Sequence, residues 1–339
     1  MTVTPTAEMP PKPQIPPNLP SLVKTVFSRA VASKHVNFYP THVTLLDVNS
    51  IPFQLRFSPS LASKPKAPVP VINISPDAPR ASRKDFFNPF ASPLPPMLIT
   101  PLPPSHNLVL NKFAIVPSHF ILSTASFKPQ THLLEADDLA AAYACIGAYD
   151  QQEGQELFVF FNSGEHSGAS QPHRHLQLLP VDNMKEGLEG QEWEVLVKGL
   201  LEPEMRGKLP FSVFAAGIER EAREDGDGEG LRRVYLGLYN KACEAVLGGE
   251  IGEQTEGEAR ISYNLAMTRT AMVVIPRLAE GAVVKDEKGQ EVGQLALNGT
   301  VLAGTALVKS QAEWDALGQD PEQVGEVLRR IGVPNRARI

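Results

Sequence analysis

Two histidines and a glutamine alternate with other residues in the segment 173–179, which reads HRHLQLL. Successive side chains of a β-strand point to opposite faces of the sheet, so residues two apart share a face. An imidazole on such a face can serve as a nucleophile or as a metal ligand, and an amide can hydrogen-bond a phosphate oxygen. A strand here predicts one face with His173, His175 and Gln177 and an opposite face with Arg174, Leu176 and Leu178.

The loop before this segment is rich in small residues that suit phosphate binding. A continuous apolar stretch, Leu157–Phe161, leads into the loop 162–172, which contains two glycines and three serines. Glycine lets a ligand approach the backbone closely, and backbone N–H groups and hydroxyls are natural donors to phosphate oxygens. The segment 162–179 therefore predicts a phosphate-binding loop that leads into the histidine strand.

Other interpretations of the histidine pair remain open on the residues alone. His-x-His spacing on a strand also suits zinc, with a third ligand supplied by an aspartate, a glutamate or a distant histidine. The pair can also be purely structural. The glycine- and serine-rich loop beside the pair favours phosphate chemistry over both alternatives.

Composition excludes several classes of protein. The 339 residues carry a net charge of −6, which argues against a basic coat that binds nucleic acid. No run of about 18 apolar residues is present to span a membrane. The two cysteines, Cys145 and Cys243, cannot form a disulfide framework or a cysteine-based zinc module. We expect a soluble protein of the cytoplasm, with the nucleus as a second location.

The elements that must position the histidine strand indicate an α+β fold with a mostly antiparallel sheet. Asn49-Ser50 suits the turn of a hairpin between two strands, and the acidic start of 135–149 favours a helix. Ser310 with Glu313 fits a capping box. The expected strands are 42–48, 51–57, 106–116, 120–123, 157–161, 173–179, 261–275 and 301–308; the expected helices are 22–32, 135–149, 183–200, 231–247 and two at the C-terminal end.

Length and composition suggest about two domains. Residues 1–20 are rich in proline and predict a disordered tail. All eight histidines lie before residue 176, so histidine chemistry belongs to the first half. We expect an N-terminal catalytic domain at 21–204 and a C-terminal domain at 205–339 that contributes to the same cleft.

The segment 167–177 (SGASQPHRHLQ) resembles the active-site signature of the fungal diadenosine tetraphosphate phosphorylases, or ATP adenylyltransferases. These enzymes belong to the histidine-triad superfamily, in the branch that holds galactose-1-phosphate uridylyltransferase. The segments 58–65, 88–90, 106–120, 262–268 and 272–277 resemble further motifs of the family, so the likeness covers roughly residues 20–335.

The resemblance implies a histidine-triad-like fold of two fused halves, with packed helices on an antiparallel sheet. It implies that His175 attacks the α-phosphorus of diadenosine tetraphosphate, expels ATP and forms an adenylyl-histidine intermediate, which phosphate converts to ADP. His173 would orient the nucleophile or bind phosphate. Gln177 stands where many triad hydrolases carry a third histidine, and a weakly basic polyphosphate leaving group needs little protonation.

The resemblance also implies residues that bind the substrate. A divalent cation such as Mg²⁺ is expected to arrive with the polyphosphate, and neither a protein-bound cofactor nor a dedicated metal site is expected. The implied substrate-binding residues are Lys64, Asn111, Lys112, Asn162, Gly168, Ala169, Ser170, Gln171, Gln177, Asn264, Thr268, Met272 and Arg277.

Two alternative functions remain. One is a related nucleotidyltransferase or hydrolase of the superfamily, such as a hexose-1-phosphate uridylyltransferase-like enzyme. The other is a nucleotide-binding protein that has lost turnover. The expected partners are diadenosine tetraphosphate, ATP, ADP and phosphate, without nucleic acid or membrane, and the expected state is a monomer or weak dimer.

Overall fold

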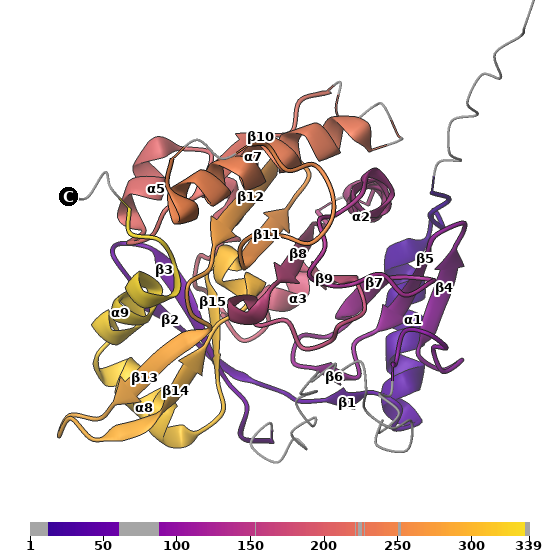
Figure 1. Cartoon of the computed structure of the whole chain (residues 1–339). Helices are drawn as coiled ribbons and strands as arrows, with labels where there is room; N and C mark the ends of the chain where they lie inside the picture. The colour runs from indigo at the N-terminus through magenta and orange to yellow at the C-terminus, as the bar shows by residue number, and fades with distance from the viewer. Residues whose placement is uncertain are drawn as a thin grey trace, which may run out of the picture.

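The computed structural model describes residues 13–335 except 61–87, 153, 221, 223–225, 227 and 250–251. Its framework is an eight-stranded sheet in the order β10-β12-β11-β8-β9-β7-β5-β4, in which every neighbouring pair is antiparallel (Figure 1). The α+β class with an antiparallel sheet is confirmed. The strands are β4 (Leu98–Leu102), β5 (His106–Leu110), β7 (Phe120–Thr124), β8 (Leu157–Ser163), β9 (His175–Pro180), β10 (Phe214–Gly217), β11 (Tyr263–Met267) and β12 (Ala271–Pro276).

Three helices cover one face of this sheet: α1 (Leu19–Ala32), α2 (Ala136–Asp150) and α7 (Glu229–Leu247). The apolar side chains between helices and sheet form the larger hydrophobic core. Leu176 and Leu178 of β9 lie in this core, as the alternation of the sequence predicts. The opposite face of β9 is therefore left for the polar residues.

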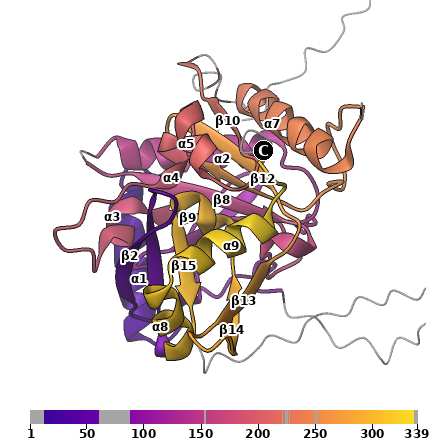
Figure 2. The ribbon, with the colours of Figure 1, turned by 90° about the vertical axis from the view of Figure 1, so that its left-hand side faces the viewer.

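A second layer packs near the other face of the sheet (Figure 2). In it, β3 pairs with β2 in an antiparallel hairpin and with β15 in parallel, so an N-terminal and a C-terminal segment share one small sheet. The layer contains β2 (His42–Asp47), β3 (Pro52–Phe57), β13 (Gly281–Lys285), β14 (Glu291–Ala296), the short helix η4 (Gly299–Ala303), β15 (Thr305–Val308), α8 (Gln311–Gln319) and α9 (Glu322–Ile331).

Local signals at turns and helix ends are confirmed. Asn49 and Ser50 have φ angles of 55° and 60°, which is the conformation of a two-residue hairpin turn matched to strand twist. At the start of α2, Glu135 and Asp138 form a capping box. Ser310 and Glu313 form the predicted box at α8.

Several predicted bounds need correction, among them the strand expected at 301–308, whose first residues belong to the short helix η4. Leu19 and Pro20 are buried in α1, so this helix begins inside the predicted tail, of which residues 1–12 lie outside the described part. The strand expected at 106–116 ends at Leu110, and β6 (Phe113–Ala114) pairs instead with β1 (Asn37–Phe38). The histidine strand begins at His175 rather than His173.

The helix expected at 183–200 is wrong. The chain forms α3 (Val181–Lys185) and α4 (Leu196–Gly199) with irregular structure between them. Gly187 and Gly190 have φ angles of 90° and 75°, which a right-handed helix cannot accommodate. A short helix α5 (Pro203–Lys208) follows.

The two predicted domains share the main sheet, because β8 of the first pairs with β11 of the second. The boundary at 204/205 stays a prediction. None of the helices in the described part of the chain is long and apolar enough to cross a membrane.

Candidate active site

The second histidine of the motif is held in one tautomer at the start of β9. His175 is 4% exposed, and its Nδ1 lies 2.8 Å from the carbonyl oxygen of His173. Because a carbonyl only accepts, Nδ1 carries the proton and Nε2 keeps its lone pair. Burial lowers the pKa of His175 to about 4, so the ring is neutral at pH 7.

The first histidine uses both ring nitrogens to bind the protein. Nε2 of His173 lies 2.9 Å from the carbonyl oxygen of Thr124 and Nδ1 lies 2.8 Å from Nδ2 of Asn88. Nε2 therefore donates and Nδ1 accepts, and burial lowers the pKa of His173. Of the two predicted roles, this arrangement fits orientation of His175 rather than contact with phosphate.

Aromatic rings line the two histidines. The ring of Phe90 lies with its centroid 5.0 Å from that of His175 and 5.6 Å from that of His173. Phe127, an exposed aromatic residue, contacts His173 with centroids 5.4 Å apart. These rings contribute to the apolar surroundings that keep the imidazoles neutral.

Gln177 shares the site with a histidine that the sequence did not select. His119 is buried, and its side chain forms a hydrogen bond with Gln177 that partly offsets the lowering of its pKa to about 4 by burial. Nδ2 of Asn111 lies 3.0 Å from Nδ1 of His119, so Asn111 reaches the site through this ring. No local signal in the sequence points to His119, because it approaches Gln177 only through the pairing of β7 with β9, in which Ile121 lies opposite Gln177.

A chain of amides connects the first half to the C-terminal portion. Oδ1 of Asn162 accepts hydrogen bonds from Nδ2 of Asn264 at 2.8 Å and from the backbone N–H of Gly299 at 2.9 Å. Because the amide oxygen is engaged, the NH₂ end of Asn162 is the end that a phosphate can use. Nδ2 of Asn264 also donates to the Ser167 carbonyl at 2.9 Å, which ties this chain to the loop.

Arg277 holds this chain of amides in place through hydrogen bonds. It is 2% exposed and donates to Oδ1 of Asn264 and to the carbonyl oxygens of Ala279, Glu280 and Leu297. Burial lowers its pKa to about 10, so it stays charged at neutral pH. Its terminal nitrogens bind the protein itself, which places Arg277 behind Asn264 rather than at a substrate.

The glycine- and serine-rich loop turns sharply beside these amides. Gly168 has a φ of 78°, and a Cβ there would lie 2.7 Å from Cβ of Asn298, so the position requires glycine. Ala169 and Ser170 are exposed, and Gln171 is half-buried. The loop therefore presents its 168–171 turn at the surface next to the histidine segment.

Three implied substrate-binding residues have other surroundings in the structure, and one lies outside its described part. Met272 packs in the core on the helix side of the sheet, and Thr268 lies in the turn between β11 and β12, at the opposite end of β11 from Asn264. Lys112 is exposed and extends over the ring of Phe113. Lys64 lies outside the described residues.

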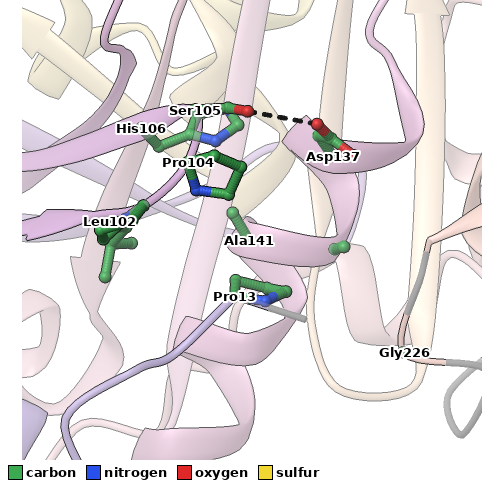
Figure 3. A pocket seen from close by; sticks show the side chains of 10 residues that line it. Pro13, Leu102, Pro104, Ser105, His106, Asp137, Ala141 and Gly226 are labelled. Atoms are coloured by element: carbon green, nitrogen blue, oxygen red, sulfur yellow. Dashed lines mark hydrogen bonds between the residues drawn. The ribbon is translucent and has the colours of Figure 1, made fainter. Parts of the chain in front are cut away.

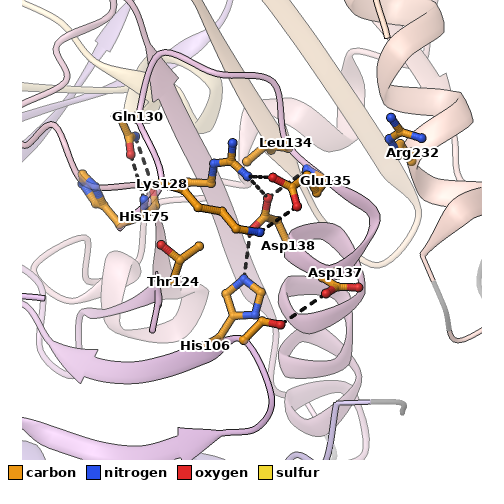
Figure 4. Close-up of polar contacts among 12 residues, drawn as sticks. His106, Thr124, Lys128, Gln130, Leu134, Glu135, Asp137, Asp138, His175 and Arg232 are labelled. Atoms are coloured by element: carbon orange, nitrogen blue, oxygen red, sulfur yellow. Dashed lines mark hydrogen bonds and ion pairs between the residues drawn. The ribbon is translucent and has the colours of Figure 1, made fainter. Parts of the chain in front are cut away.

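The opposite side of the histidine segment carries a charged cluster on α2 (Figure 4). Arg174 is 2% exposed and lies 2.8 Å from Oδ2 of Asp138 and 2.7 Å from Oε1 of Glu135. Oδ1 of Asp138 lies 2.8 Å from Nε2 of His106. The prediction that Arg174 faces away from the site is confirmed.

A small pocket lies elsewhere, between α2 and the turn from β4 to β5 (Figure 3). Prolines, leucine and alanines form most of its wall, with Ser105, His106 and Asp137 at one side, and none of the candidate catalytic or substrate-binding residues lines it. Among the described residues, no three His, Cys, Asp or Glu side chains gather in a way that could hold a metal ion.

Comparisons with known proteins agree with this geometry. Residues 10–193 match the family model of the Ap4A phosphorylase N-terminal domain, where Ap4A is diadenosine tetraphosphate. Residues 207–334 match that of the ATP adenylyltransferase C-terminal domain. Protein APA1 of Saccharomyces cerevisiae is 26% identical over 333 residues, which are 95% of this chain and 96% of the yeast protein.

Further similarity is found to a second yeast enzyme and its structures. Diadenosine 5',5'''-P1,P4-tetraphosphate phosphorylase 2 of S. cerevisiae is 28% identical over 297 residues, 84% of this chain and 85% of that protein. The crystal structure of yeast Ap4A phosphorylase Apa2 in complex with AMP has a TM-score of 0.70 at 25% identity and covers 96% of this chain and 99% of its own. The chain belongs to the Ap4A phosphorylase family.

Proposed function

We propose that this protein is an Ap4A phosphorylase that converts diadenosine tetraphosphate and phosphate to ATP and ADP. Membership of the family and the named activity of the yeast relative support this assignment. The observation that carries it is the state of His175, a neutral imidazole whose Nδ1–H is bound to a carbonyl so that Nε2 is free to attack phosphorus.

The reaction takes place in two displacements at one phosphorus atom. Nε2 of His175 forms a bond to the α-phosphorus while the bond to the bridging oxygen breaks, and ATP leaves with that oxygen. A phosphate oxygen then attacks the same phosphorus, the bond to His175 breaks, and ADP forms. The histidine returns unchanged, so atoms and charge balance over the cycle.

Gln177 suits this leaving group. An amide donates hydrogen bonds but is a poor proton donor, and ATP is a weakly basic leaving group that departs without a full proton. The lowered pKa of His119 beside it also leaves no strong acid at this position at neutral pH. The site is therefore built for transfer between phosphates rather than for expulsion of a basic alkoxide.

The phosphates lie against neutral donors. The NH₂ group of Asn162 and the backbone of the 168–171 turn flank the segment that carries His175, and the register of β8 with β9, continued past its last pair, would place Asn162 opposite His175. A divalent cation that travels with the polyphosphate would neutralise part of its charge and would be held by substrate oxygens. We expect activity to depend on Mg²⁺ without a resident metal.

Product analysis with labelled inorganic phosphate tests the assignment. Incubation with diadenosine tetraphosphate should place the label in ADP and yield equal amounts of unlabelled ATP. A hydrolase would release AMP and leave the label in phosphate. Nucleotide binding without any product over hours would support the inactive alternative, and both of these results contradict the proposal.

A further inference from the structure

A glutamine outside the motifs contacts the main chain of the proposed nucleophile. Gln130 is 3% exposed, and its Oε1 accepts the backbone N–H of His175 at 2.7 Å. Its Nε2 donates to the carbonyl oxygen of His175 at 3.1 Å and to that of Asn162 at 2.8 Å. Figure 4 shows both bonds between the Gln130 amide and His175. One side chain thus satisfies both main-chain groups of the nucleophile.

These bonds lie where the pairing of β8 with β9 ends. The paired positions run from Leu157↔Pro180 to Phe160↔Gln177, and the same register continued would place Asn162 opposite His175. Opposed residues in a hydrogen-bonded antiparallel pair exchange both N–H···O bonds. The Gln130 amide, which has one carbonyl and N–H donors like a peptide, takes the position of the missing peptide at His175.

The position of Gln130 is itself set by main-chain contacts. Its backbone N–H donates to the carbonyl oxygen of Pro172 at 2.8 Å. The two residues before Gln130 make similar contacts. Pro129 forms a β-bridge with His173, and the carbonyl oxygen of Lys128 accepts a hydrogen bond from the backbone N–H of Arg174 at 2.7 Å. The segment 128–130 thus follows the start of the histidine segment and delivers the amide to one place.

We propose that Gln130 is a positioning residue that holds the main chain of His175 in line for attack on phosphorus where β8 no longer supports it. This inference rests on the proposed function. The bond from Nδ1 to the His173 carbonyl orients the ring, and the Gln130 amide fixes the backbone from which the ring extends. Loss of the amide leaves an N–H and two carbonyls unpaired and lets His175 shift.

Rapid-quench measurement of adenylyl transfer to the enzyme without inorganic phosphate tests this role. The burst amplitude counts folded, competent sites, and the rate constant per site reports alignment of the nucleophile. Gln130→Met keeps the length of the side chain and removes every hydrogen bond. We expect its rate constant per site to fall about 100-fold, because small misplacements of reacting atoms have effects of that order. We expect the amplitude and the KM for diadenosine tetraphosphate to stay within about threefold of wild type.

Gln54→Met is the matched control. Gln54 is a fully buried glutamine of β3 whose Nε2 donates to the Met184 carbonyl at 2.9 Å and whose Oε1 accepts from Arg56 at 3.0 Å. Its substitution should lower the unfolding midpoint and leave the rate constant per site unchanged. An equal loss of rate in both variants would show a general effect of burial and overturn the assignment.

Two other results would overturn the role of Gln130. In one, Gln130→Met lowers only the burst amplitude and reacts at the wild-type rate, as a purely structural residue would. In the other, neither quantity changes. In both cases wild-type enzyme still carries the adenylyl group on His175, so the proposed function stands. Wild-type enzyme without an adenylyl-histidine would instead overturn the proposed route and this assignment together.

Discussion

The two sides of the segment 173–177 differ in charge. On the site side, His173, His175 and Gln177 are bonded to amides, carbonyls and a neutral ring. On the helix side, Arg174 pairs with Asp138 and Glu135. Neighbouring residues of this extended segment thus alternate between an uncharged site and a buried ion cluster.

The difference shows how the protein keeps a nucleophilic imidazole neutral. A carboxylate beside an imidazole raises its pKa and favours the protonated ring, which has no lone pair to attack with. Within the described part of the chain, Asp138 and Glu135 are engaged on the far side of this segment. Burial would raise the pKa of Asp138, but the bond from His106 and the charge of Arg174 outweigh it and lower the pKa overall. Ion pairs between side chains thus anchor the segment on its helix side, and their charges face away from the site.

The largest expected effect comes from the site side. Replacement of His175 by alanine removes the nucleophile and should reduce phosphorolysis by at least about 10⁴-fold. Labelled-phosphate assays measure the loss, and His42→Ala on the exposed side of β2 serves as the control. Activity within tenfold of wild type in His175→Ala would show that His175 is not the nucleophile and that turnover does not depend on the site side.

The helix side should affect stability instead of turnover. Arg174→Met leaves the Asp138 carboxylate buried without its cation and should lower the free energy of unfolding by about 3–5 kcal/mol. Turnover per competent site should change less than about tenfold. Urea unfolding and burst titration measure the two quantities separately.

Lys128→Ala is the matched variant for Arg174→Met. Lys128 pairs with Glu135 at 2.6 Å, but the side chains are 27% and 50% exposed, so the loss should stay below about 1 kcal/mol. A large loss of turnover with unchanged stability in Arg174→Met would reverse the comparison.

The two sides should also respond to acid in different pH windows. The pKa of His175 is about 4 in the folded protein and ordinarily 6.5, so the unfolded chain takes up a proton first as pH falls. This residue therefore lowers the free energy of unfolding between pH 6.5 and 4, by up to about 3 kcal/mol in total. In His175→Asn the decline over this window should be shallower by that amount.

Asp138 provides the contrast in the same urea titrations. Its lowered pKa gives stability that is present above the ordinary aspartate value, near 3.8, and is lost as pH falls through the folded value. Asp138→Asn should therefore change the slope only below about pH 4. Parallel curves for wild type and His175→Asn from pH 7 to 4 would show that folding does not lower the pKa of His175.

The sequence predicted what depends on local periodicity. The alternation of HRHLQLL assigns Leu176 and Leu178 to the core, and they lie there, because side chains of a strand alternate between faces. The turn at Asn49-Ser50 and the box at Ser310 followed from short-range chemistry. The helix expected at 183–200 failed because the composition of that segment did not reveal that Gly187 and Gly190 take positive φ angles.

Of the substrate-binding residues that the resemblance implies, the structure brings some together and places others elsewhere. Asn162 and Asn264 meet because β8 pairs with β11 in a register that puts them opposite each other. Met272 faces the helices instead, because its place on β12 puts its side chain in the core on that side. Arg277 lies one layer behind the site. Its charge is consistent with a phosphate ligand in the sequence, but its contacts are with carbonyls.

The sequence by itself determined which residue types could do the chemistry and which face of their strand each would occupy, because a strand's period of two is a local property. Only the tertiary structure decided what surrounds them. His119 reaches Gln177, and Gln130 reaches His175, through pairings between strands and loops that are 45 or more residues apart. No local pattern encodes such pairings, because hydrogen bonds between distant segments form only after packing has set the register of the sheet.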